Sequence, residues 1–125
     1  MAGWTKFEDI LVWQKAMLYC QEIHLISQNT PLKNDYKLRD QVNASGGSIM
    51  DNIAEGFGRG GNIEFIHFLE ISHGSTTESQ SQLYRILDKK YIDDKKFSQL
   101  YELAEEIRKM LLSLINYLSR SPFTG

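Results

Sequence analysis

The sequence predicts an all-α protein, folded as an antiparallel up-down four-helix bundle. Apolar residues recur at alternating steps of three and four in four successive segments, and no segment alternates with the period of two that a strand requires. The two prolines, Pro31 and Pro122, both fall outside these segments. We therefore expect one domain over residues 1–125, with four helices of similar length joined by short loops.

The first helix is expected over residues 8–27. Its apolar side chains form two neighbouring stripes, one that includes Trp13 and one that includes Val12 and Ala16. A stripe this wide predicts contact with more than one neighbouring helix. The polar segment around Pro31 then ends the helix.

The second helix is expected over residues 35–56 and the third over residues 63–90, with Asn62 as the N-cap of the third. The fourth is expected over residues 93–119, with Asp93 at its start and Arg120 near its end, as the helix dipole favours. Its apolar stripe consists of Phe97, Leu100, Ala104, Ile107, Leu111, Leu114 and Leu118.

Composition limits the classes of function. The formal net charge is −2, so the chain lacks the basic excess typical of freestanding nucleic-acid-binding proteins. Cys20 is the single cysteine, which rules out an internal disulfide and favours a reduced, cytoplasmic setting. The N-terminal residues lack the pattern of a signal peptide, and no apolar run approaches the length of a membrane span.

A glycine-rich segment over residues 43–61 raises the question of a phosphate site. Gly56, Gly58 and Gly61 match the spelling G-x-G-x-x-G. A dinucleotide site needs a strand before these glycines and a helix after them, whereas a helix precedes them here. A Walker loop would end in G-K-[ST], but Asn62 follows the last glycine. The segment is therefore interpreted as structural.

The structural interpretation assigns two tasks to these glycines. Gly46 and Gly47 lie mid-helix, where a glycine costs about 0.5–1 kcal/mol relative to alanine, so they predict a close helix–helix contact. Gly74 lies in a matching small-residue stretch of the third helix. Gly56 or Gly58 is expected to take the left-handed conformation that ends the second helix.

Several cations are candidates for contact with a nucleic acid. Arg59 lies on the glycine loop, where it can satisfy the last helix carbonyls, pair with Glu55, or contact a phosphate. The densest basic cluster lies around the loop between the third and fourth helices, where nearby aspartates would cancel part of its field. The cluster comprises Arg85, Lys89, Lys90, Lys95 and Lys96.

Two catalytic or metal-binding alternatives carry less support. The Glu-x-x-His segments Glu64–His67 and Glu70–His73 have the spacing used in di-iron bundles, but both lie on one helix and face different directions. Cys20 and His24 are one helical turn apart, without a third group to orient them. We therefore expect no catalytic residue, no metal and no cofactor. Trp13 is instead expected at a subunit interface, where aromatic residues are enriched.

Three segments carry a resemblance to a known family. FEDILVWQKA (residues 7–16), SIMDNIAEGFGR (residues 48–59) and EFIHFLEISHGSTTESQSQL (residues 64–83) resemble the ribosomal-RNA intervening-sequence proteins. The chain is also similar to accessory proteins of diversity-generating retroelements. The most specific part is the N-I-A-E-G-x-G-R core, formed here by Asn52, Ile53, Ala54, Glu55, Gly56, Gly58 and Arg59.

The resemblance implies a left-handed four-helix bundle that assembles into a homopentameric ring, has no catalytic activity and binds nucleic acid through basic surfaces. It also implies that Glu55 and Arg59 form the polar signature between helices two and three, and Trp13 and Gln14 that of helix one. Relatives often carry arginines after the glutamine of helix two, but Val42 follows Gln41 here.

The function predicted from the sequence is that of a non-enzymatic oligomeric adaptor or scaffold, with RNA or DNA as a candidate partner. An interaction bundle that binds only protein is the main alternative, since each lost cation removes a phosphate contact. A metal-binding bundle is a weaker alternative.

Overall fold

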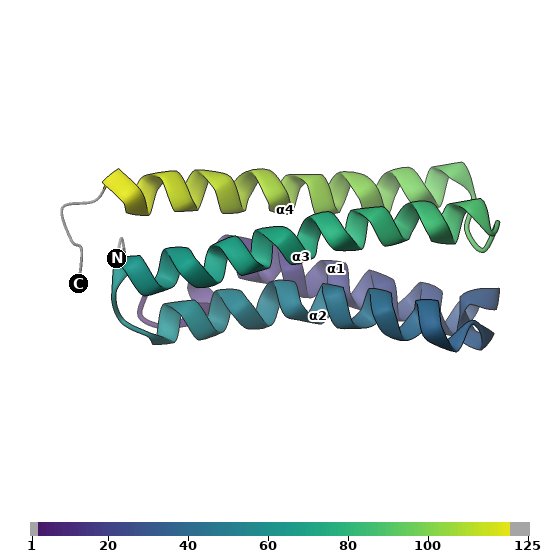
Figure 1. Cartoon of the computed structure of the whole chain (residues 1–125), viewed down its shortest axis with the longest axis horizontal. Coiled ribbons are helices and arrows are strands. Elements are labelled where there is room, and N and C mark those ends of the chain that lie inside the picture. The colour runs from purple at the N-terminus through teal and green to yellow at the C-terminus, as the bar shows by residue number, and fades with distance from the viewer. Residues whose placement is uncertain (1–2, 121–125) are drawn as a thin grey trace.

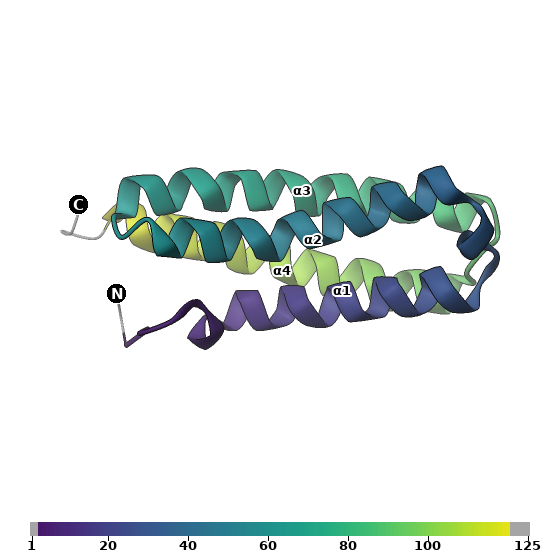
Figure 2. The same cartoon turned by 90° about the horizontal axis from the view of Figure 1, so that it is seen from below.

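The computed structural model describes residues 3–120, so the two ends of the expected 1–125 domain lie outside the described part. Four helices run alternately up and down and pack side by side along their whole length (Figures 1 and 2). They are α1 (Leu11–Asn29), α2 (Tyr36–Gly58), α3 (Asn62–Asp88) and α4 (Asp94–Arg120), and two short 3-10 turns, η1 (Phe7–Asp9) and η2 (Pro31–Asn34), precede α1 and α2. No strand occurs among the described residues. The all-α, up-down prediction is confirmed.

The first helix begins later than the sequence predicts. The carboxylate of Asp9 accepts hydrogen bonds from the backbone N–H groups of Thr5 (3.2 Å) and Lys6 (3.3 Å), which stabilises the 3-10 turn η1. Ile10 is extended and buried, and the α-helix starts only after it. The expected start at Glu8 is therefore wrong, because η1 and an extended residue occupy that stretch. The helix also continues past residue 27, as far as Asn29.

The connection between α2 and α3 corrects the predicted roles of its glycines. Gly56 and Gly58 are both helical, and the left-handed residue of the turn is Gly60, with φ +87°. Gly61, not Asn62, stands at the N-cap of α3. Asn62 instead lies in the first turn, where its side-chain amide donates to the carbonyl of Leu118 on α4 at 3.3 Å. Its side chain therefore joins α3 to α4 instead of capping α3.

Helices α2 and α3 are antiparallel neighbours, as predicted, but serines make the contact where glycines were expected to. The hydroxyl of Ser72 donates to the carbonyl of Ile49 at 2.7 Å, and Ser48 and Ser75 share a hydrogen bond of 2.8 Å. A Cβ atom placed on Gly47 or Gly74 would meet nothing within 4 Å. The predicted packing role of these two glycines is therefore wrong within the single chain, because both face open space.

Gly46 and Gly56 do lie against other helices. A Cβ atom on Gly46 would lie 3.7 Å from Cys20 Sγ and 3.8 Å from the ring of Tyr19, which is ordinary contact. A Cβ atom on Gly56 would lie 2.7 Å from Cβ of Phe68, closer than carbon atoms approach in proteins. The closest approach between helices that depends on a glycine is therefore at Gly56.

At the opposite end of the bundle, α3 ends at Asp88, two residues before the predicted end. Lys90 adopts φ +62° in the turn, and this left-handed residue reverses the chain. Asp93 then accepts a hydrogen bond from the backbone N–H of Lys96 at 2.8 Å and so caps α4. The fourth helix ends at Arg120, one residue beyond the prediction.

The core runs along the bundle axis and contains most of the predicted stripes. The Val12 stripe of α1 is buried, whereas the stripe of Trp13 and Met17 is half-buried to exposed. On α4 the buried members of the predicted stripe are Leu100, Ala104, Ile107, Leu111 and Leu118. None of the helices in residues 3–120 combines the length and apolar character of a membrane span.

Candidate functional site

Residues 52–59, the most specific part of the family resemblance, pack the end of α2 against α3. Ile53 is fully buried, and Gly56 allows Phe68 of α3 to approach. The side-chain amide of Asn52 donates to the carbonyl of Ser48 (2.8 Å). The segment therefore has a structural task, as predicted, and it builds no phosphate cradle among the described residues.

Arg59 is engaged within its own bundle. Its guanidinium lies 3.0 Å from the carboxylate of Glu55 and stacks over the ring of Phe68, 4.9 Å from the centroid. The pair is half-exposed on both sides, so it contributes little to stability. Arg59 lies at the α2–α3 end of the bundle, whereas the lysine cluster lies at the other end (Figure 1). The structure therefore does not bring Arg59 together with the other candidate cations.

The predicted lysine cluster is divided by its ion pairs. Lys89 lies 3.2 Å from Asp35, and Lys96 lies 3.0 Å from Glu22 of α1. Arg85 donates to the side-chain oxygen of Gln41 on α2 at 3.0 Å. Three of the five predicted cations are therefore already held by side chains of other segments.

Lys90 and Lys95 remain exposed, without an ion pair among the described residues. Lys90 shares a shallow hollow at the α3–α4 turn with Asp88, Asp93 and Asp94. Three carboxylates around one ammonium group make the local field acidic. An anionic phosphate is disfavoured in this hollow.

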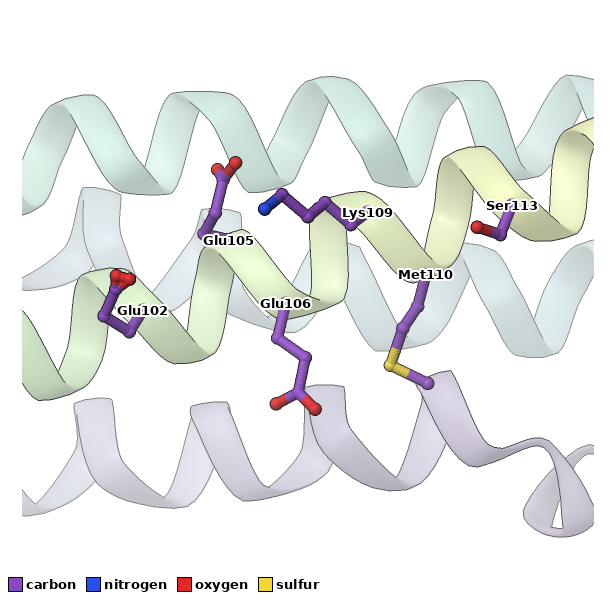
Figure 3. A pocket seen from close by; sticks show the side chains of 6 residues that line it. All are labelled: Glu102, Glu105, Glu106, Lys109, Met110 and Ser113. Carbon is purple, nitrogen blue, oxygen red and sulfur yellow. The ribbon is translucent and has the colours of Figure 1, made fainter.

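A second hollow lies on the outer surface of α4. Its lining consists of Glu102, Glu105, Glu106, Lys109, Met110 and Ser113. All six side chains come from one helix, and Figure 3 shows Glu105 directed towards α3 while Glu106 and Met110 point towards α1. Binding pockets usually enclose a ligand between several elements. The hollow is therefore a groove on one helix and lacks the enclosure of an active site.

Glu105 is fixed by two neighbours. Arg108 donates to its carboxylate from Nε (2.9 Å) and from Nη2 (2.5 Å), and the amide of Gln80 on α3 donates at 3.0 Å. These bonds, that from Arg108 above all, lower the pKa of Glu105 to about 2. A carboxylate that stays ionised and fully engaged is a poor general acid or base at neutral pH.

The remaining catalytic and metal candidates show no cooperating geometry. Burial raises the pKa of the Cys20 thiol to about 11, so the group is protonated at neutral pH. His24 is exposed. No group of three or more potential metal ligands occurs in the described residues, which include both Glu-x-x-His segments. His73 keeps one buried ring nitrogen, Nε2, without a hydrogen-bond partner.

Exposed apolar side chains are the feature that the sequence analysis missed. Leu11, Leu18 and Leu25 of α1 are 56%, 44% and 47% exposed. Their constant spacing of seven was visible in the sequence, but none of the three belongs to either of the two apolar stripes predicted for this helix. On the α3–α4 side, Tyr84 packs on Phe97 with ring centroids 4.8 Å apart and remains largely exposed.

Comparisons with known proteins agree with this fold. The crystal structure of a protein of unknown function from the S23 ribosomal protein family of Bacteroides thetaiotaomicron VPI-5482 aligns with a TM-score of 0.76 and 26% identity. The alignment covers 84% of this chain and 98% of that one. The comparison with curated proteins finds no match. A family model described as "23S rRNA-intervening sequence protein" matches residues 8–113. The chain therefore belongs to the 23S rRNA-intervening sequence protein family.

Proposed function

We propose that the protein is a non-catalytic scaffold that assembles into a homo-oligomer, with five subunits as the number expected from the family resemblance. The observation that carries this proposal is the set of leucines exposed along α1. Large apolar side chains that recur in the exposed positions along one side of a helix are typical of protein contact sites. Trp13 is half-buried, packs edge-on against Phe7 with centroids 5.1 Å apart, and lies about 140° around α1 from these leucines, so it remains a candidate for a separate contact.

The state of the polar groups supports a non-catalytic role. Cys20 is a protonated thiol, Glu105 is engaged by Arg108 and Gln80, and the groove on α4 is lined by one helix. A catalytic centre requires a nucleophile or base within hydrogen-bond reach of a second group and of a substrate position. The lone cysteine also supports the proposal of a reduced, cytoplasmic setting.

The direct test is the mass of the assembly in solution. Light scattering at micromolar concentration is expected to give a multiple of the 14.4 kDa protomer, and five protomers if the resemblance holds for assembly. A mass equal to that of one protomer at all accessible concentrations would remove the proposal.

Contact with RNA is a second candidate function, favoured by the match to the family of 23S rRNA-intervening sequence proteins. Lys90 and Lys95 are the exposed cations left for it at the α3–α4 turn, since Lys89 and Lys96 are paired, and a phosphate must reach them from outside the acidic hollow that Lys90 shares with three aspartates. Counterion release makes phosphate binding steeply salt-dependent. Titration of labelled RNA at low ionic strength is expected to show binding that weakens as salt rises, and Lys90→Glu with Lys95→Glu is expected to weaken it further. A flat titration leaves the protein-only scaffold as the function.

A further inference from the structure

The exposed leucines of α1 form a single face. Leu11, Leu18 and Leu25 are separated by seven residues, about two helical turns, so they follow one another along about 21 Å of the helix. The opposite side of α1 carries the buried residues Val12 and Ala16. We call these three side chains the leucine face. Nothing in the described chain covers it.

The leucine face borders the α1–α4 side of the bundle. Lys15 of α1 reaches Glu106 of α4 at 3.4 Å, and Met110 of α4 points towards α1 (Figure 3). A spacing of seven matches one apolar position of the heptad repeat with which helices pack knobs into holes, and polar residues such as Lys15 and Glu22 occupy the positions between the leucines. The geometry therefore selects a helix as the partner, and that helix must offer recesses at a matching spacing.

The outer side of α2 offers such recesses. A Cβ atom on Gly47 or Gly58 would meet nothing within 4 Å, and Ala44 is exposed between polar neighbours. Ala44, Asp51 and Gly58 are spaced by seven residues, as the leucines are. We call Ala44, Gly47, Asp51 and Gly58 the small-residue face. Bulky side chains of a partner helix can approach the backbone there.

The two faces lie at the same heights along the bundle. Helices α1 and α2 are antiparallel (Figure 2), and two contacts fix their register: Asn43 donates to Ser27 at 2.9 Å, and Gly46 lies beside Cys20. By this register each leucine lies within about one helical turn of the height of one member of the small-residue face, which is Asp51 in the case of Leu18. The pairs are Leu25 with Ala44, Leu18 with Asp51, and Leu11 with Gly58.

Equal heights have a consequence for assembly. A rotation about an axis parallel to the bundle, without a shift along it, brings the leucine face of one copy level with the small-residue face of the next. Contacts between two different faces propagate head to tail, and they close into a ring when the rotation involves no translation.

Charge is complementary across the same pair of faces. Lys15 lies between Leu11 and Leu18, at the height of the α2 segment that contains Asp51 and Glu55. Asp51 is exposed and forms no ion pair within residues 3–120. The ammonium group of Lys15 lies 3.4 Å from Glu106 within its own chain but is 33% exposed, so at the rim of the contact it can also approach the Asp51 carboxylate of the next copy, where it contributes to specificity.

We propose that the leucine face of α1 packs head to tail onto the small-residue face of α2 in a second copy of this chain. The inference rests on the proposed function, because it names the surfaces through which the scaffold assembles. It also assigns Gly47 the packing role that it lacks within a single chain.

The test uses two single variants and a matched control. Leu18→Glu places a charge on the leucine face, and Gly47→Glu fills the small-residue face; neither position contacts the core, so both variants should keep the helical circular dichroism of the wild type. Each is expected to raise the dissociation constant of the assembly by about a hundredfold or more and to give monomers at micromolar concentration. The control is Leu112→Glu, at a similarly exposed leucine (39%) outside both faces, which should assemble like the wild type.

Mixing the two variants tests the head-to-tail order. The Leu18→Glu chain keeps an intact small-residue face and the Gly47→Glu chain keeps an intact leucine face, so an equimolar mixture can form one contact and should yield dimers. Assembly of Gly47→Glu alone would mean that leucine faces pair with each other, which overturns the proposal. Assemblies of Leu18→Glu as large as those of the wild type would overturn the proposed contact between the two faces and leave the scaffold function intact. A monomeric wild type would overturn the scaffold function itself.

Discussion

Replacing Gly56 by alanine is expected to destabilise the bundle even though alanine favours helices. The added Cβ would lie 2.7 Å from Cβ of Phe68, 3.0 Å from Cδ1 of Phe65 and 3.3 Å from the carbonyl oxygen of Phe65. Carbon atoms pack best at about 3.5–4.0 Å, so α3 must move by nearly 1 Å at this point. The Cβ atom of Phe68 is fixed to its backbone and cannot rotate away.

The magnitude follows from two opposing terms. Overpacking of a tight contact costs about 1–3 kcal/mol, whereas Gly→Ala in a helix interior contributes about 0.5–1 kcal/mol of stabilisation. The two ranges leave a net loss in the free energy of unfolding of up to about 2.5 kcal/mol, with about 1 kcal/mol as the central value, which corresponds to a decrease in Tm of about 4 °C for a chain of this size. Alanine at Gly74 is the matched control, because its Cβ would meet nothing within 4 Å. This variant should be slightly more stable than the wild type.

The assay is urea unfolding followed by circular dichroism, at one protein concentration for all variants because assembly shifts apparent stability. If the Gly56→Ala protein is as stable as the Gly74→Ala protein, the close approach of α2 and α3 at this glycine does not exist in solution.

Three further predictions concern buried and ionised groups. Tyr19→Phe removes the buried 2.6 Å hydrogen bond shared by Tyr19 and Ser79 and is expected to cost about 1–2 kcal/mol in urea unfolding, a cost that largely disappears when Ser79→Ala is already present. The pKa of Glu105 is lowered from 4.5 to about 2, chiefly by Arg108, so the ionised carboxylate stabilises the fold above pH 4.5 and this stabilisation is lost as the pH falls towards 2. The Glu105→Gln variant should therefore lose less stability than the wild type between pH 4.5 and 2. Equal acid sensitivity of the two proteins would contradict this. The Cys20 thiol should react slowly with a disulfide reagent at pH 7.5 and faster as the pH approaches about 11, whereas rapid reaction at neutral pH would show that it is neither buried nor protonated.

The periodic apolar pattern predicted the helices well because burial in a bundle is set by position on each helix. Leu100 and Leu111 of α4, for example, were predicted to face the core and are buried. The helix limits were less accurate where side chains act on the backbone. Asp9 stabilises a 3-10 turn, and no periodic pattern predicts that hydrogen bond. Gly56 is helical and lies against Phe68, a partner that sequence alone does not identify.

The candidate site was less predictable, because it depends on which distant residues meet. Lys89 and Lys96 appear as one basic cluster in the sequence, but Asp35 and Glu22, which come from earlier segments, pair with them in the fold. A charge count cannot detect such pairing. The exposure of Leu18 was equally missed, since this residue belongs to neither of the two apolar stripes predicted for α1.

The hydrogen bonds of Asp35 have a consequence for local opening of the bundle. One of its carboxylate oxygens accepts from the N–H of Leu38 at the start of α2, and the other accepts from Tyr91 (2.9 Å) and Lys89 (3.2 Å) in the α3–α4 turn. A single side chain thus joins the backbone at the start of α2 to two side chains of the α3–α4 turn, more than 50 positions away in the chain. Opening of either segment breaks the bonds of Asp35 to the other, so the amides of both should exchange with solvent together and this end of the bundle should open in a single step.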